Sequence, residues 1–337
     1  MNMTEPLAAK PGALTPEVLK IDLAGEADRI GRWMVDTLVN KLHKRGVVVA
    51  MSGGIDSSCC AALAVHALGP KKVFGLLLPE RDSSSFSSHR GRMLAEHLGI
   101  EYEVNDIAPA LEGLGCYARR DEAIRRVFPQ YGEGWKNKIV IAGGTERGIN
   151  FFKLVVQSPQ GEMFDKRLPL KDYLQIVAAT NFKQRVRKTM EYYHADRLNY
   201  AVIGTPNRLE YDQGFFVKNG DGAADLKPIA HLYKTQVYAM VRHLGAPDEV
   251  CNAVPTTDTY TLAQGQDEFY FALPHAQMDL ALWAYNHGRP AAELATALGI
   301  AEDHARLVYA DIEAKRRTTH YLHARPELVE PIAEIHA

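Results

Sequence analysis

A serine, two glycines and an aspartate separate an apolar run from a helix-forming run in the stretch VVVAMSGGIDSS, residues 47–58. The β-branched residues before this loop predict a buried strand, and the Ala- and Leu-rich residues after it predict a helix. Backbone N–H groups in such a loop converge with the positive end of the following helix, so an anion fits there. The phosphate-binding string G-x-x-x-x-G-K-[ST] occurs nowhere in the sequence. A reaction other than simple γ-phosphate transfer is therefore indicated.

Each polar group of this loop has a chemical use. Glycines let the backbone approach a phosphate closely, serine hydroxyls add hydrogen-bond donors, and Asp56 can hold Mg²⁺ against the phosphates. The candidate ATP contacts are Ser52, Gly53, Gly54, Asp56, Ser57 and Ser58. The plainer interpretation is a glycine turn with a helix cap, but the predicted strand before the loop and the helix after it favour the phosphate site.

The elements around this loop alternate between strand and helix. The predicted strands are residues 47–50, 72–78, 100–107 and 200–205, and the predicted helices are 22–43, 56–68, a helix ending at Gly99, 181–198 and 234–245. Such alternation predicts an α/β fold with a doubly wound parallel sheet, Rossmann-like and three-layered, with right-handed crossovers. Ligands of such sheets bind beyond the carboxyl ends of the strands, where the Ser52 loop is expected.

The alternation breaks between residues 107 and 179. A short helix over 121–131 and antiparallel strands over 138–144 and 151–168 are expected there, which indicates a β-rich insertion. The Thr- and Gln-rich residues 255–268 predict a mobile loop, and the remainder of the C-terminal part is predicted helical. We expect one domain over residues 20–330 that carries the 107–179 insertion, with an N-terminal extension over residues 1–19.

Composition bounds the class of protein. With 337 residues, 46% of them hydrophobic and 24% charged, the chain is expected to be globular, and its apolar runs are shorter than the ~20 residues that span a membrane. A net charge of −2 gives no overall attraction to nucleic acid. The four cysteines lack C-x-x-C spacing and are expected to be reduced packing residues. No secretory signal is predicted, so a cytoplasmic protein without a membrane or nucleic-acid partner is expected.

The S-G-G-I-D-S string resembles the loop of the N-type ATP pyrophosphatases, which hold the two phosphates that leave together as pyrophosphate. Residues 181–247, from NFKQRVR through GTPNRLE and LYKTQV to HLGAP, resemble the NAD synthetase family, and the resemblance runs from about Ile21 to Arg317 apart from the insertion. It implies an adenine nucleotide α-hydrolase-like fold. It also implies a carbon–nitrogen ligase that uses ATP as co-substrate to adenylate the carboxylate of nicotinate adenine dinucleotide (deamido-NAD), which ammonia then converts to NAD.

The resemblance also implies roles for individual residues. Asp56 and Lys234 would be catalytic, and Asp56 and Glu210 would bind Mg²⁺. Thr205, Lys234 and Thr256 would contact ATP, and Arg185, Lys218, Asp225 and Lys315 would bind the dinucleotide. Plainer interpretations stay open: Arg185 on an exposed helix face, Glu210 capping a turn, Lys218 paired with Asp225, and Lys234 and Lys315 solvated.

The sequence departs from the family pattern at several positions: Pro206, Leu209, Asp212 and Ala314. The serine-rich residues 79–88 lack the usual adenine-contacting residues, so no adenine contact is assigned. No glutamine-hydrolysing arrangement is recognised in the sequence, so free ammonia or a separate glutaminase is expected to supply nitrogen, and the resemblance implies a homodimer.

Three alternatives stay open. The same chemistry could act on a different carboxylate, or the chain could be a non-catalytic nucleotide-binding relative. An RNA-thiolating pyrophosphatase is disfavoured, because paired cysteines and a basic surface are not visible.

Overall fold

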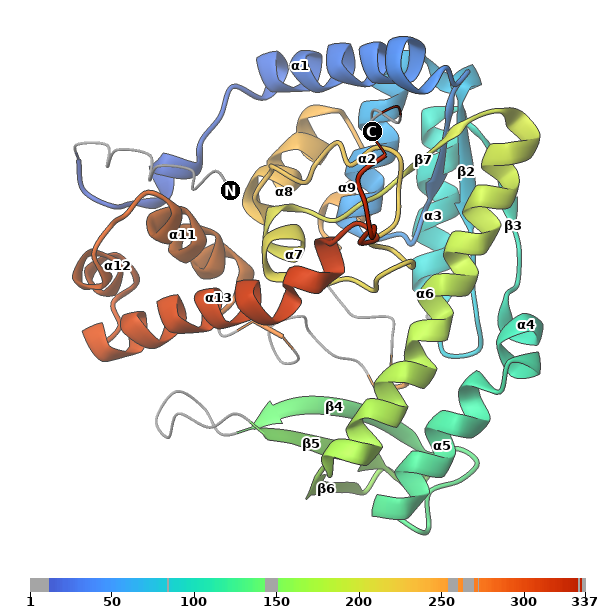
Figure 1. The fold of residues 1–337 in the computed structure, drawn as a ribbon, viewed down its shortest axis with the longest axis vertical. Helices are drawn as coiled ribbons and strands as arrows, with labels where there is room; N and C mark the ends of the chain where they lie inside the picture. Colours follow the sequence, from blue (N-terminus) through green and yellow to red (C-terminus); the bar gives the residue numbers. More distant parts are fainter. Residues whose placement is uncertain are drawn as a thin grey trace.

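The computed structural model describes residues 12–83, 85–142, 151–253, 260–262, 270–271, 273–332 and 334. Its centre is a four-stranded parallel sheet in the order β3-β2-β1-β7 (Figure 1). The strands are β1 Val47–Ala50, β2 Val73–Leu77, β3 Glu101–Val104 and β7 Ala201–Ile203. The predicted parallel sheet is confirmed, and its carboxyl edge carries the residue 51–54 loop.

Side-chain alternation along β1 divides the core into two layers, because successive strand residues point to opposite faces. Val47 and Val49 pack with the helices on one face: α1 Leu23–Asp36, its continuation Thr37–Leu42, α2 Ile55–Leu68, α3 Ser85–Leu98, α8 Lys234–His243 and α9 Asp248–Cys251. Val48 packs on the other face with α4 Ala108–Gly113, α5 Cys116–Val127 and α6 Leu170–Leu198. The sheet between two helical layers is the predicted three-layer arrangement.

The break in alternation produces a separate antiparallel sheet. It has the order β4-β5-β6, with β4 Lys136–Ala142, β5 Phe151–Gln157 and β6 Met163–Arg167. The β5–β6 turn closes through Gly161 N–H, which donates to Ser158 O at 2.9 Å. This sheet shares a core with α5 and the first part of α6, and Figure 1 shows it below the parallel sheet at the far end of α6.

Helix α6 is longer than predicted. The prediction of a start near Asn181 was wrong, since the helix begins at Leu170 directly after Pro169 and runs for 29 residues. Residues 170–180 contain neither glycine nor proline, so nothing interrupts the helix, and Ile176 and Ala179 are buried against neighbouring elements. One continuous helix therefore spans the second sheet and the parallel sheet.

The C-terminal part is helical, as predicted. It consists of α11 His275–Asn286, α12 Ala291–Leu298 and α13 Glu302–His323. Their core includes two residues of the expected extension: Leu14, before the short helix η1 Pro16–Leu19, and Leu19, the last residue of that helix. Within the described residues, the structure has no helix that combines the length and the apolar character needed to cross a bilayer.

Candidate active site

A cavity of about 720 Å³ opens at the carboxyl edge of the parallel sheet and continues along α6 to the antiparallel sheet. Its volume lies in the ~300–1,000 Å³ range of ligand pockets. Ten of the residues predicted from sequence line it: Ser52, Gly54, Asp56, Ser57, Arg185, Thr205, Glu210, Lys218, Lys234 and Lys315. Residues from four separated parts of the chain thus meet in one space.

The Ser52 loop is held in shape by its own hydroxyl groups. Ser52 N–H donates to Ser57 Oγ at 3.3 Å, and Ser57 Oγ donates to Gly54 O at 3.1 Å. Gly53 has a φ of +73°, and a Cβ there would lie 2.2 Å from Ser87 O, so this position requires glycine. Ser58 Oγ donates to Gly54 O at 2.8 Å. Gly53 and Ser58 are outside the described lining of the cavity, and their contacts help to fix the shape of the loop.

Lys234 lies beside this loop, close to two carboxylates. Its ammonium pairs with Asp56 and is 4.0 Å from Glu210, although its side chain is only 2% exposed. Burial lowers the pKa of Lys234, but the charges of Asp56 and Glu210 outweigh burial, so the pKa is raised and the lysine stays protonated. Asn207 Nδ2 donates to Asp56 Oδ1 at 2.9 Å. The site therefore combines one fixed cation with two carboxylates.

Helix starts place these three groups. Asp56 is in the first turn of α2, and Glu210 closes the capping box of Asn207 at the start of the short helix α7 Arg208–Gln213. Lys234 begins α8, where Asp279 of α11 accepts hydrogen bonds from the N–H groups of Lys234 (3.2 Å) and Thr235 (2.7 Å). Burial raises the pKa of Asp279 to about 6. Sequence reasoning missed this capping residue, because no local motif connects it to Lys234.

The donor set suits a magnesium ion. Mg²⁺ is commonly bound through one or two carboxylates and completed by phosphate oxygens and water. Asp56 and Glu210 supply two carboxylates beside the phosphate loop. The described residues contain no group of three or more His, Cys, Asp or Glu side chains arranged for a metal.

The predicted dinucleotide ligands have different environments. Arg185 Nε donates to Lys218 O at 3.3 Å, and Lys218 Nζ donates to Tyr321 O at 2.7 Å. Lys315 Nζ donates to Asp311 at 2.7 Å, and burial lowers its pKa. These three cations line the cavity, so the interpretation of Lys315 as a solvated surface residue does not describe it.

Asp225 is placed differently. Its exposed carboxylate accepts a 2.7 Å hydrogen bond from Val202 N–H and one of 3.3 Å from Tyr192, and it lies outside the described lining of the cavity. Here it supports β7, and its role toward substrate stays a prediction. Thr256 lies outside the described residues.

The structure places two of the departures from the family pattern. Pro206 lines the cavity immediately after Thr205. Asp212 accepts hydrogen bonds from Arg316 Nε at 2.7 Å and from its second nitrogen at 2.6 Å, so the added charge is neutralised by the basic run near the C-terminus.

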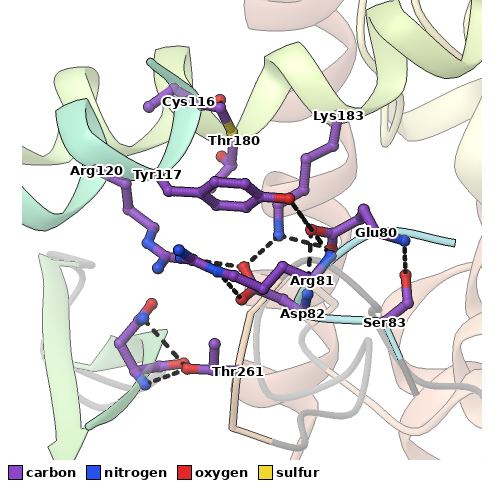
Figure 2. Close-up of polar contacts among 12 residues, drawn as sticks. Glu80, Arg81, Asp82, Ser83, Cys116, Tyr117, Arg120, Thr180, Lys183 and Thr261 are labelled. Carbon is purple, nitrogen blue, oxygen red and sulfur yellow. Dashed lines mark hydrogen bonds and ion pairs between the residues drawn. The ribbon is translucent and has the colours of Figure 1, made fainter. Parts of the chain in front are cut away.

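A buried ionic cluster after β2 was not predicted (Figure 2). Lys183 of α6 lies 3.0 Å from Glu80 and 2.8 Å from Asp82, and Arg120 of α5 reaches Asp82 at 2.6 Å. Tyr117 donates to Glu80 at 2.8 Å. The string PERD, residues 79–82, departs from the family pattern and so drew attention to this segment. Its charged residues pair with side chains of α5 and α6, and the sequence alone does not predict where those helices pack. Lys183 itself lines the cavity, so the cluster forms part of its wall.

The fold and loop define a nucleotide-binding α/β protein of the ATP pyrophosphatase class. A sequence model of the NAD synthase family matches residues 29–125 and 146–321. The NH(3)-dependent NAD(+) synthetase of Rhizobium meliloti (strain 1021) is 57% identical over 95% of this chain and 96% of its own length. That of Mesorhizobium japonicum is 55% identical over 94% of this chain and 100% of its own length. The chain belongs to the NAD synthase family.

Solved structures show the same fold. The NMN synthetase from Francisella tularensis matches 93% of this chain and 100% of its own, with a TM-score of 0.62 and 21% identity. The NH3-dependent NAD synthetase from Campylobacter jejuni matches 92% of this chain and 100% of its own, with a TM-score of 0.58 and 21% identity. At these identities the comparison bears on architecture alone.

Proposed function

We propose that this protein is an ammonia-dependent NAD synthetase, which converts deamido-NAD to NAD with ATP and ammonia and releases AMP and pyrophosphate. The observation that carries the proposal is the meeting of Asp56, Glu210 and Lys234 beside the Ser52 loop in one cavity. Relatives named NH(3)-dependent NAD(+) synthetase, 54–57% identical along nearly the whole chain, support the choice of substrate.

The chemistry has two balanced steps. A carboxylate oxygen of the nicotinate group attacks the α-phosphorus of ATP, and the bond to pyrophosphate breaks. Ammonia then attacks the acyl carbon, AMP leaves, and the nitrogen loses a proton to form the amide. Dividing the reaction in this way replaces a poor electrophile by an activated acyl group.

Positioning and charge neutralisation are the contributions we assign to this chain. Ser52, Ser57 and the loop N–H groups would bind the phosphates that leave, and protonated Lys234 would offset the negative charge that develops on them. Asp56 and Glu210 would hold Mg²⁺, which, when bound, withdraws charge from phosphate oxygens. Arg185, Lys218 and Lys315 add positive charge along the cavity for the anionic dinucleotide.

The test is incubation of the purified protein with deamido-NAD, ATP, Mg²⁺ and ammonium, with NAD and pyrophosphate measured together. NAD and pyrophosphate in equal amounts support the proposal. Pyrophosphate release that does not depend on deamido-NAD would indicate another carboxylate, and nicotinate mononucleotide is the first alternative acid to supply. Absence of turnover with every acid would favour a non-catalytic nucleotide-binding relative.

The assembly and the nitrogen source are separate proposals. We expect a cytoplasmic homodimer, which light scattering coupled to size-exclusion chromatography would measure as twice the chain mass. Free ammonia, or ammonia from a separate glutaminase, is expected to support turnover, and glutamine alone is expected to be inactive with the purified protein.

A further inference from the structure

The cavity has a second end whose walls are apolar and aromatic. This end is lined by Ile141, Phe151, Phe152, Tyr173 and Val177. All five come from the antiparallel sheet and the first half of α6, the region where the sequence departs from simple strand–helix alternation. The resemblance assigned no ligand to these residues, so the role of this wall is open.

Strand register explains why aromatic groups reach the cavity. Ile139 pairs with Leu154, and both side chains are fully buried in the core between the sheet and the helices α5 and α6. Two residues further along the same face, Ile141 pairs with Phe152. This second pair is only partly buried and lines the cavity. The core between the antiparallel sheet and the helices therefore borders the cavity at this pair.

Helix α6 completes the wall. The rings of Tyr173 and Phe152 stack with centroids 4.1 Å apart and an interplanar angle of 12°. Val177 follows Tyr173 by one helical turn and lines the same space. The Phe152–Tyr173 stack sets the orientation of both rings, and a preorganised aromatic surface binds a flat ligand at little conformational cost.

The same helix changes character along its length. Tyr173 and Val177 line the apolar end, whereas Lys183, Arg185 and Arg187 line the end nearest the Ser52 loop. Val177 and Arg187 are separated by about 15 Å along the helix axis, at 1.5 Å per residue. ATP has the same polarity, because its flat, uncharged adenine stands at one end and its anionic phosphates at the other. Each nucleotide half of deamido-NAD likewise joins a flat ring to a phosphate.

We propose that Phe152, Tyr173 and Val177 form the subsite for the heteroaromatic ring of a nucleotide substrate. The inference rests on the proposed function for the identity of the nucleotides, which are ATP and deamido-NAD. Both offer a ring of the required chemistry, and the experiment distinguishes them. Stacking of a base on an aromatic side chain depends on the π-face of that side chain. Replacing the aromatic residue by an aliphatic one of similar polarity should therefore weaken the stacking.

The test uses two variants and one control. Phe152→Leu keeps an apolar side chain but removes the π-face, and Val177→Phe fills the space in front of it. Phe164→Leu is the matched control, since Phe164 is an aromatic residue of the same sheet, on β6, outside the described lining of the cavity. Dissociation constants of ATP and deamido-NAD are measured separately by titration calorimetry, and the unfolding transitions of all proteins are recorded.

We expect the Kd of one nucleotide to rise about tenfold in both Phe152→Leu and Val177→Phe, with the other nucleotide and the Phe164→Leu control within twofold of wild type. The nucleotide whose Kd rises is the substrate whose ring occupies the subsite. Unchanged affinities in both variants, or a change in Phe152→Leu that Val177→Phe does not reproduce, would overturn the proposal.

Failure of the subsite and failure of the proposed function are distinguishable. A wild-type protein that forms no NAD, while both variants lose affinity for a nucleotide, would refute the function and leave the subsite standing. A wild-type protein that forms NAD, with variants that bind both nucleotides normally, would refute only the subsite.

Discussion

Lys183 of α6 and Asp82 of the loop after β2 form a buried ion pair, with 2.8 Å between Nζ and Oδ2. Both side chains are almost fully enclosed, and Arg120 of α5 binds the same aspartate. Burial raises the pKa of Asp82, but the charges of Lys183 and Arg120 outweigh burial and hold it below its usual value. This pair joins the carboxyl edge of the parallel sheet to the helices that carry the antiparallel sheet, so the two walls of the cavity are fixed to each other.

Breaking this cluster should destabilise the protein strongly. Lys183→Met leaves Glu80 and Asp82 buried with one cation fewer, and we expect a loss of roughly 3–5 kcal/mol in the free energy of unfolding. The control is Lys153→Met, which removes an exposed ion pair with Asp165 and should cost less than about 1 kcal/mol. Denaturant unfolding measures both. Equal losses in the two variants would contradict the structural role assigned to the cluster.

Replacement of Asp56 by asparagine should lower the turnover number. Asp56→Asn removes the charge that pairs with Lys234 and one carboxylate proposed for Mg²⁺, so we expect kcat for NAD formation to fall by about 10²–10³-fold. Asp303→Asn, at an exposed position of α13, serves as the control. The measurement is the steady-state rate of NAD formation at saturating Mg²⁺. A kcat of Asp56→Asn within tenfold of the wild-type kcat would contradict the assigned role.

Gly53 should not tolerate a side chain. Its φ of +73° disfavours L-residues, and the Cβ of Gly53→Ala would collide with Ser87 O, so the loop must shift. We expect a rise in KM for ATP of about tenfold or more, together with a lower melting temperature. Gly113→Ala is the matched control, because no atom lies within 4 Å of a Cβ there and alanine favours the helix. A normal KM for ATP in Gly53→Ala would show that the loop conformation is not needed.

Asp279 should make stability depend on pH in acidic solution. Its pKa is raised by burial from 3.8 to about 6, so the folded state binds a proton that the unfolded state has already lost in this range. Its contribution to stability is therefore greatest below pH 4 and falls by about 3 kcal/mol as pH rises through 6.

The Asp279→Asn variant cannot ionise at this position. Relative to wild type, its free energy of unfolding should improve between pH 4 and 7, although its absolute value also reflects the changed cap of α8. Denaturant unfolding at pH 4, 5, 6 and 7 provides the comparison. Parallel stability curves for the two proteins would show that Asp279 does not titrate in this window.

Several features were readable from the sequence because they are local. The strand, loop and helix around Ser52 follow from neighbouring residues, and the parallel sheet follows from repeated alternation of strands and helices. The start of α6 was missed because residues 170–179 were assigned to the insertion, although they contain no helix breaker.

The chemistry of the loop and the class of fold were thus determined by the sequence itself. Tertiary structure alone decided which distant side chains meet. Asp56 and Lys234 are 178 residues apart, and Lys183 and Asp82 are 101 residues apart. Packing of the layers also directed Asp225 toward β7 and opened the aromatic core of the antiparallel sheet into the cavity. Contacts of this kind depend on how helices and sheets dock, and periodicity along the chain contains no information about that docking.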